Sequence, residues 1–257
     1  MTTAYWCAGM FASGSTWAFN VMRGMLAGAY PGRAVKGRFV NVAADLDGLD
    51  DADAVHVVKS HDMAPEVAAE LLRRATRLVV TIRDPRDAVT SLMLYQRYRF
   101  EQALTTIAKS GNFVAGLVAD PRALLLRYES GFIEDAGTLD RMAAWFGTRL
   151  PAAERDRLFA AHRRAAVEGL IAGLDDLPQA QRDARSGDIF DPETQWHRHH
   201  AGRSGEVGRW RRMLLPGQAA AVEREMRELM ARFDYPPAPA LAPAYTLNVG
   251  TFSLKLS

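Results

Sequence analysis

Residues 9–20 read GMFASGSTWAFN and lie between a short apolar run, Thr3–Gly9, and a segment with apolar residues at helical spacing, Thr16–Ala27. This pattern predicts a strand, a tight turn and a helix. A helix that begins near Ser15 offers free backbone N–H groups and the positive end of its dipole to an anion. Gly14 lets an anion approach closely. The stretch therefore indicates a phosphate-binding loop.

This loop differs from the usual G-x-x-x-x-G-K-[ST] motif at one position. When Gly9 and Gly14 are aligned with the motif, Ser15 stands where the motif has lysine. A nucleoside triphosphatase normally needs that lysine for the β- and γ-phosphates and an aspartate at a strand end for magnesium. Only Asp84 follows an apolar run in a convincing way. The sequence therefore disfavours a nucleoside triphosphatase.

Further strands and helices alternate along the next 130 residues. The apolar runs Ala54–Lys59 and Leu78–Arg83 are rich in β-branched residues, as strands buried on both faces are, and Ala123–Tyr128 is a fourth strand candidate. Helical spacing is found at Pro65–Arg74 and from about Phe132 to Phe146. The alternation predicts an α/β fold with three layers, α/β/α, and a central parallel sheet of the P-loop NTPase type. Ligands of such sheets bind at the C-terminal strand ends.

The C-terminal part of the chain is less regular. Pro151–Leu174 has the pattern of one long amphipathic helix that breaks or ends near Gly169 and Gly173, and Pro216–Phe233 has that of a second helix. Residues 175–208 show little periodicity and predict a long loop, which in a folded domain is usually functional or mobile.

Chain length favours a single domain. At 257 residues the sequence suffices for one sizeable core and is short for two domains. We expect one α/β domain over residues 1–235. The proline-rich and strand-like residues 236–257 form a separate tail, which could serve as an edge strand or as an arm in a homo-oligomer.

Composition narrows the class of protein. The net charge of +2 is too small to indicate a nucleic-acid partner. Cys7 is the only cysteine, which excludes an internal disulfide and a cysteine-based zinc site. The N-terminus lacks a basic segment before its apolar residues, and no stretch reaches the roughly 18 apolar residues of a membrane span. We therefore expect a cytoplasmic protein without an integral membrane segment.

Five segments together resemble the sulfotransferases that use 3′-phosphoadenosine 5′-phosphosulfate (PAPS). FASGSTW at 11–17 is similar to the PKSGTTW loop that binds the 5′-phosphosulfate in that family. KSH at 59–61 resembles its KTH, IRDPRDAVTS at 82–91 its 3′-phosphate segment, RYE at 127–129 its RYEDL, and RSGEVGRW at 203–210 its RKGxxGxW loop. Each motif alone is weak, but all five occur in the family's order and at expected strand ends or loops.

The resemblance implies a site that binds PAPS and releases adenosine 3′,5′-bisphosphate (PAP), with no metal required. The implied cofactor-binding residues are Ser13, Gly14, Ser15 and Thr16 for the phosphosulfate, Arg83, Ser91 and Arg203 for the 3′-phosphate, Trp17 and Tyr128 for the adenine, and Ser204, Gly205 and Gly208 in the closing loop. His61 is the implied general base, and the acceptor is a hydroxyl or, less favoured, an amine of a small molecule, glycan or lipid.

Two positions depart from the family pattern. The lysine or arginine two residues before the loop glycine is Ala12 here, and the lysine of RKG is Ser204. The family's loop lysine stabilises charge on the leaving phosphate, so another cation is needed near the sulfuryl group. Lys59 is the first candidate, because it ends the strand beside His61, and Arg23 is a weaker one, because it points down the helix away from the loop.

Other interpretations remain open from the sequence. The chain could be a nucleotide-binding phosphotransferase of the same fold class, or a catalytically weakened sulfotransferase-like scaffold. Arg83 could pair with Asp84 or Asp87, and Trp17 could be a core residue. The HRHH segment at 197–200 suggests a metal site, but no carboxylate or cysteine has clear ligand spacing, so we expect a solvated loop there.

Overall fold

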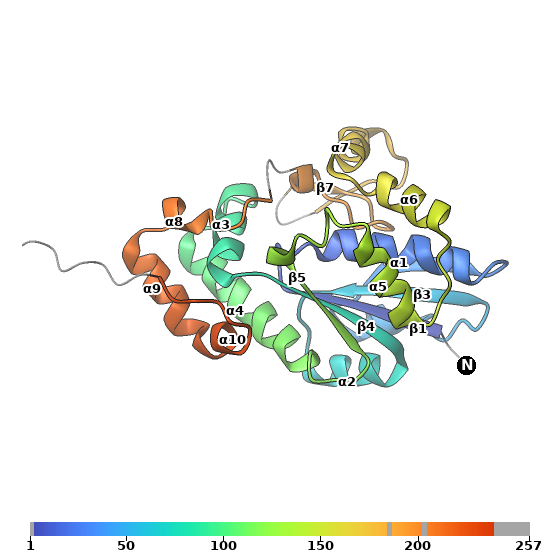
Figure 1. Cartoon of the computed structure of the whole chain (residues 1–257), viewed down its shortest axis with the longest axis horizontal. Coiled ribbons are helices and arrows are strands. Elements are labelled where there is room, and N and C mark those ends of the chain that lie inside the picture. Colours follow the sequence, from blue (N-terminus) through green and yellow to red (C-terminus); the bar gives the residue numbers. More distant parts are fainter. Residues whose placement is uncertain (1–2, 184–186, 202–204, 239–257) are drawn as a thin grey trace, which may run out of the picture.

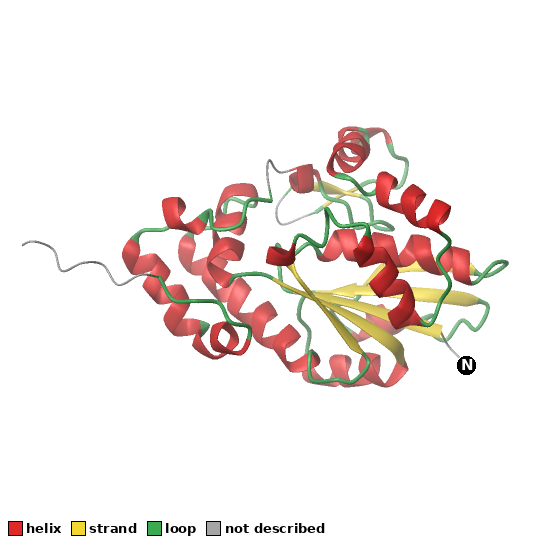
Figure 2. Cartoon of the chain, in the orientation of Figure 1, coloured by secondary structure: helices red, strands yellow, loops and turns green. Residues whose placement is uncertain are grey.

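A five-stranded parallel sheet forms the centre of the molecule (Figures 1 and 2). The computed structural model describes residues 3–183, 187–201 and 205–238. The strand order is β2-β3-β1-β4-β5. The strands are β1 (Thr3–Gly9), β2 (Ala34–Phe39), β3 (Ala54–Ser60), β4 (Ala75–Ile82) and β5 (Ala123–Arg127). The predicted α/β architecture with a parallel sheet is confirmed.

Helices cover both faces of this sheet (Figure 1). One layer contains α1 (Ser15–Ala29), α5 (Gly137–Phe146), α6 (Ala152–Ala161) and α7 (Arg164–Ala172). The opposite layer contains α2 (Pro65–Arg74), α3 (Pro85–Tyr95), α4 (Phe100–Leu117), α8 (Trp210–Met213), α9 (Pro216–Glu225) and α10 (Arg227–Arg232). Neighbouring residues of β1 point into different layers, because Trp6 packs with the second group and Cys7 with the first.

The strands predicted from apolar runs are all present. Every residue of β3 is buried, which explains why AVHVVKS lacks the alternation of a half-exposed strand. Strand β2 was missed because AVKGRF carries two charged residues and a glycine, and none of its residues is fully buried. Such a sequence suits an edge strand, which β2 is.

The prediction of one long helix over residues 151–174 is wrong. The structure has α6 and α7 instead, separated at His162 and Arg163 rather than at the glycines. The indole Nε1 of Trp17 donates a hydrogen bond to the carbonyl oxygen of His162 at 3.0 Å. Trp17 of α1, which lies 145 residues away in sequence, thus donates to the His162 carbonyl oxygen that the helix break leaves without a helical partner.

Other boundaries differ by smaller amounts. The helix expected from about Phe132 begins at Gly137, and Pro216–Phe233 is divided at Met226 into α9 and α10. The loop expected over 175–208 includes a short antiparallel pair, β6 (Gln181–Arg182) and β7 (Ile189–Phe190). Residues 239–257, which make up most of the predicted tail, lie outside the described residues. Within the part that is described, no helix is long and apolar enough to cross a membrane.

Candidate functional site

The turn between β1 and α1 is shaped by two glycines. Gly14 has a φ of 83°, and a Cβ placed there would lie 2.9 Å from Ile133 and 3.0 Å from Phe132. At Gly9 a Cβ would lie 2.3 Å from the Cβ of Ser15. Helix α1 then begins at Ser15, so its first N–H groups have no acceptor within the helix. The turn therefore has the form of an anion-binding loop.

Ser13 has a different environment from its neighbours. Its side chain is fully buried, and its hydroxyl donates to the carbonyl oxygen of Met10 and hydrogen-bonds the hydroxyl of Thr81 at 2.6 Å. Ser13 thus ties the turn to the ends of β1 and β4. The sequence suggested that its hydroxyl contacts phosphosulfate, but in this structure the hydroxyl faces the sheet.

A single cavity of about 1280 Å³ lies at the C-terminal ends of the strands. Its wall contains ten of the residues selected from the sequence, namely Gly14, Ser15, Thr16, Trp17, Lys59, His61, Arg83, Ser91, Tyr128 and Gly205. Arg203 and Ser204 lie outside the described residues, so their predicted roles stay predictions. The fold thus gathers segments that are as much as 191 positions apart (14 to 205) around one space.

Arg83 connects two loops at this cavity. Its guanidinium donates to the carbonyl oxygens of Ala12, at 3.2 Å, and Glu206, at 2.8 Å, and lies over the ring of Tyr128 at 4.2 Å. The residue is 5% exposed, and its side-chain Nε has no hydrogen-bond partner among the described residues. A buried donor without an acceptor is costly, so a ligand acceptor at this position would be favourable.

The acidic residues beside Arg83 have partners of their own. Asp84 caps α3 and forms an ion pair with Arg86 at 2.7 Å. Asp87 lies 3.9 Å from Arg83 and accepts hydrogen bonds from the backbone N–H groups of Gly208 and Trp210. Asp87 thereby attaches the segment after residue 205 to α3. The first turn of α3 thus fixes the closing loop, while Ser91, farther along the helix, faces the cavity.

Tyr128 and Gly205 are in close contact. A Cβ added at Gly205 would lie 1.8 Å from the Tyr128 hydroxyl oxygen. Tyr128 also packs edge-to-face on Phe132, which in turn packs against Trp17. Trp17 is buried in the core and also lines the cavity, so its place in the core is confirmed, and its contact with adenine stays a prediction.

Lys59 and His61 form a buried pair at the end of β3. His61 Nδ1 lies 2.7 Å from the carbonyl oxygen of Gly9, which can only accept, so Nδ1 carries the proton. The basic nitrogen is therefore Nε2, and Lys59 Nζ donates to it at 3.0 Å. The His61 ring stacks on Phe11 at 3.9 Å, a contact that the sequence did not suggest.

Burial changes the acid–base behaviour of this pair. It lowers the pKa of Lys59 from 10.5 to about 8, so the ammonium group stays mostly protonated at neutral pH. Burial, followed by the nearby Lys59 charge, holds the pKa of His61 well below its ordinary value. His61 is therefore a neutral imidazole at neutral pH, which is the form a general base requires.

The HRHH segment is not the solvated loop that we expected. His200 is half-buried, and its Nδ1 accepts a hydrogen bond from the backbone N–H of His197. His197 and His199 each place Nδ1 within hydrogen-bond distance of Asp188, at 2.9 and 2.6 Å. All four residues line the large cavity. Asp188 was missed because the antiparallel bridge between Phe190 and His197, and not sequence spacing, brings it to the histidines.

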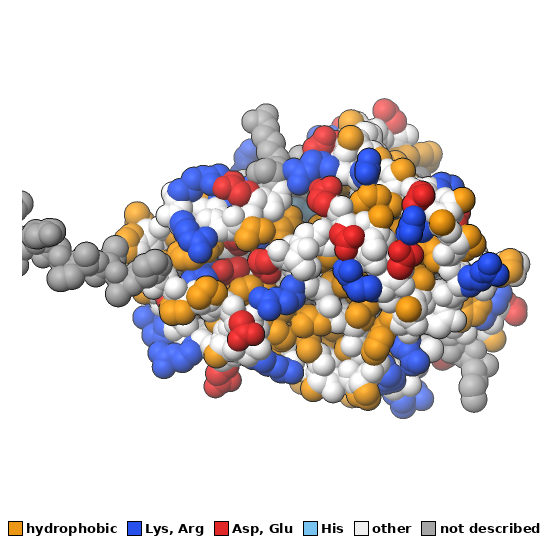
Figure 3. Space-filling model, viewed as in Figure 1, with side chains coloured by type: hydrophobic (Ala, Val, Ile, Leu, Met, Phe, Trp, Pro, Cys, Tyr) orange, Lys and Arg blue, Asp and Glu red, His pale blue; other side chains and the backbone are white. Residues whose placement is uncertain are grey.

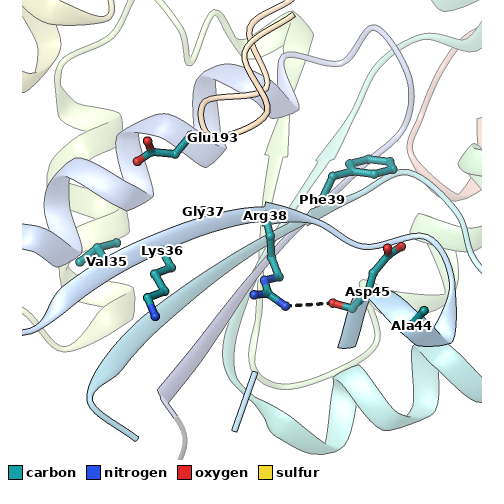
Figure 4. A pocket seen from close by; sticks show the side chains of 8 residues that line it. All are labelled: Val35, Lys36, Gly37, Arg38, Phe39, Ala44, Asp45 and Glu193. Carbon is teal, nitrogen blue, oxygen red and sulfur yellow. Dashed lines mark hydrogen bonds between the residues drawn. The ribbon is translucent and has the colours of Figure 1, made fainter. Parts of the chain in front are cut away.

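Three further segments reach the same cavity. They contribute Tyr95, Gln96, Tyr98 and Gln102 from α3, α4 and the loop between them, Phe190 and Trp196 from the 175–200 segment, and His162, Arg164 and Val167 from the α6–α7 region. A second hollow of about 450 Å³ lies along edge strand β2, where Arg38 donates to the carbonyl oxygen of Asp45 (Figure 4). None of the residues selected from the sequence as site residues lines that second hollow.

The architecture of this chain is similar to that of several solved structures. The mouse sulfotransferase SULT7A1 complexed with PAP aligns over 91% of this chain and 86% of its own, with a TM-score of 0.63 and 14% identity. Retinol dehydratase in complex with androsterone and inactive cofactor PAP aligns over 89% of this chain and 81% of its own, with a TM-score of 0.59 and 17% identity. The chain has the sulfotransferase fold.

The sulfotransferase fold extends over nearly the whole chain. A sulfotransferase domain from the curacin biosynthetic pathway covers 93% of this chain and 99% of its own length, with a TM-score of 0.54 and 12% identity. No protein-family model matches the sequence, and no curated protein matches it. The sulfotransferase fold is therefore recognised here through its three-dimensional arrangement.

Proposed function

We propose that this protein is a PAPS-dependent sulfotransferase that transfers a sulfuryl group to an acceptor hydroxyl or, less favoured, an amine. The observation that carries the proposal is the single cavity on which the β1–α1 turn, the Lys59–His61 pair, Arg83 and Gly205 converge. PAP in the structurally similar proteins supports the choice of nucleotide. The acceptor class is a small molecule, a glycan or a lipid.

The nucleotide site is proposed to extend from the β1–α1 turn to α3. Backbone N–H groups at Gly14–Thr16, with the Ser15 and Thr16 hydroxyls, bind the 5′-phosphosulfate. Arg83 and Ser91 bind the 3′-phosphate, which would supply an acceptor for the unpartnered Nε of Arg83. The adenine lies between Trp17 and Tyr128. This arrangement assigns the phosphosulfate, the 3′-phosphate and the adenine of the nucleotide to residues that line the cavity.

Transfer requires an acceptor oxygen to attack sulfur as the bond from sulfur to the phosphate oxygen breaks. We propose that His61 Nε2 takes the acceptor's proton and that PAP leaves with the bridging oxygen. Lys59 now donates to that same Nε2, so it must turn toward the phosphosulfate before His61 can act. There its charge stabilises the leaving phosphate in place of the absent lysine at Ala12.

Phosphotransfer is less well supported by the same site. A phosphotransferase of this fold class would need a magnesium ligand at a strand end. Asp84 is the residue that suits this role from the sequence, but its carboxylate caps α3 and pairs with Arg86. The neighbouring Asp87 is engaged by two backbone N–H groups.

Ligand selectivity tests the nucleotide assignment. We expect PAP to raise the melting temperature more than adenosine 5′-monophosphate, which lacks only the 3′-phosphate, and more than ATP with magnesium. Equal shifts for PAP and the monophosphate would contradict a 3′-phosphate site, and a larger shift with ATP and magnesium would favour a phosphotransferase.

Transfer of labelled sulfate from PAPS tests catalysis. An acceptor panel of phenols, alkyl alcohols, sugars, lipid hydroxyls and amines would identify the acceptor class. Labelled product is expected with one class and not without enzyme. PAP binding without transfer to any acceptor would instead support a nucleotide-binding scaffold. As an internal check, Ala12→Lys is expected to restore part of the turnover that Lys59→Met removes.

A further inference from the structure

Asp188, His197 and His199 form a compact cluster on the wall of the large cavity. A single oxygen of Asp188, Oδ2, lies 2.9 Å from His197 Nδ1 and 2.6 Å from His199 Nδ1. One potential ligand atom from each residue lies within 4.8 Å of the other two. The side chains are 14 to 22% exposed, so they are largely shielded but reachable from the cavity.

Local backbone structure holds the cluster together. Asp188 directly precedes β7, and Phe190 in β7 forms an antiparallel bridge with His197. The rings of Phe190 and His197 stack at 4.9 Å. His200 accepts the backbone N–H of His197. Two of the three side chains are therefore positioned by strand pairing and by ring packing.

The present distances are those of hydrogen bonds, and a small outward shift would suit a divalent ion. Two ligand atoms that are each about 2.1 Å from a tetrahedral ion lie about 3.4 Å apart. The present nitrogen–oxygen distances of 2.6 and 2.9 Å need to grow by only about 0.5 to 0.8 Å to reach that value. Two imidazole nitrogens and one carboxylate are a ligand set that Zn²⁺, Co²⁺ and Ni²⁺ accept.

We propose that Asp188, His197 and His199 bind a divalent transition-metal ion of the zinc class, with a remaining coordination position open to the cavity. Coordination through Nδ1 moves each ring proton to Nε2. For His199, Nε2 lies 3.3 Å from the side-chain amide of Gln96, which can present its oxygen to that proton after an amide flip. The site is independent of the proposed sulfuryl transfer, because no residue of the nucleotide site takes part.

Metal titration of the purified full-length chain tests this site. After removal of any affinity tag and of metal with a chelator, calorimetric titration with Zn²⁺ is expected to give one ion per chain. Asp188→Asn and His199→Gln are expected to lower the affinity by more than about 100-fold, since even residues that only support a metal ligand contribute 10- to 100-fold. The matched controls Asp176→Asn and His162→Gln are expected to keep the wild-type affinity.

A ligand-retaining variant separates coordination from hydrogen bonding. His199→Cys keeps a metal-binding atom but changes the hydrogen bond to Asp188, and with Co²⁺ it is expected to gain sulfur-to-cobalt absorption in the near ultraviolet. Binding of Co²⁺ that is identical in wild type, Asp188→Asn and His199→Gln would overturn the proposal. So would the absence of stoichiometric Zn²⁺ binding to the wild-type chain, which would leave a hydrogen-bonded cluster.

Discussion

Replacing Lys59 with methionine should remove a free-energy cost that the wild-type protein carries at neutral pH and loses in alkali. The same replacement should lower the turnover. Lys59 is 3% exposed, and burial lowers its pKa from 10.5 to about 8. Because one pH unit of such a difference is worth about 1.4 kcal/mol, keeping this lysine charged in the folded protein costs about 3 kcal/mol. Methionine has a similar volume and no charge.

The pH dependence isolates this cost. Below pH 8 Lys59 is protonated in both the folded and the unfolded chain, so the full cost is present. Between pH 8 and 10.5 the folded protein has lost the proton that the unfolded chain still holds, so its stability rises with pH. Lys59→Met lacks this rise. Relative to the variant, wild type should gain about 2 kcal/mol between pH 7 and pH 9.5.

Urea unfolding of both proteins at these two pH values measures the difference, and titrations that they share, such as those of tyrosines, cancel. A difference that stays constant with pH would refute the argument that burial lowers the pKa of Lys59. Transfer assays on the same samples should find turnover reduced sharply in Lys59→Met while PAP still binds. If Lys59→Met keeps the wild-type turnover, Lys59 does not stabilise the leaving phosphate.

Three further predictions concern the same cavity. His61→Ala is expected to keep PAP affinity and to lose about 100-fold or more in turnover, and a retained rate would remove it as the base. Arg83→Ala should weaken PAP binding by about 1.5 to 3 kcal/mol, or roughly 10- to 150-fold, and should weaken adenosine 5′-monophosphate binding less. Equal losses for the two ligands would mean that Arg83 acts only by holding its two loops. Gly205→Ala should weaken PAP binding by about 1 to 3 kcal/mol, because the added Cβ meets the Tyr128 hydroxyl. Adding Tyr128→Phe to this variant should recover part of the lost affinity. If no affinity is recovered, the strain lies elsewhere.

Electrostatics favour a small charged ligand over an extended polyanion. The net charge is +2. On the face seen in Figure 3, basic and acidic side chains are interspersed rather than gathered into one basic patch. The cations with an argued role, Lys59 and Arg83, are buried at the cavity instead. Two buried cations thus lie where the nucleotide is proposed to bind.

Local sequence patterns were sufficient for much of the framework. The bounds of β1 follow from an apolar run, and those of α2 follow from helical spacing after Pro65. The phosphate-loop turn was also recognisable, because glycine at a φ of 83° is a local backbone requirement. These features depend on residues that are neighbours in sequence, so the sequence alone is enough to predict them.

Only the tertiary structure determined how distant groups meet. The Gly9 carbonyl sets the proton position on His61, 52 residues away, and Trp17 contacts the break between α6 and α7. Asp188 reaches His197 and His199 through strand pairing, although their spacing in sequence gave no such signal. Periodicity and turn residues specify helices and strands because they act between residues that are close in sequence. The direction of each side chain at the strand ends is instead set by packing among elements that are far apart in sequence.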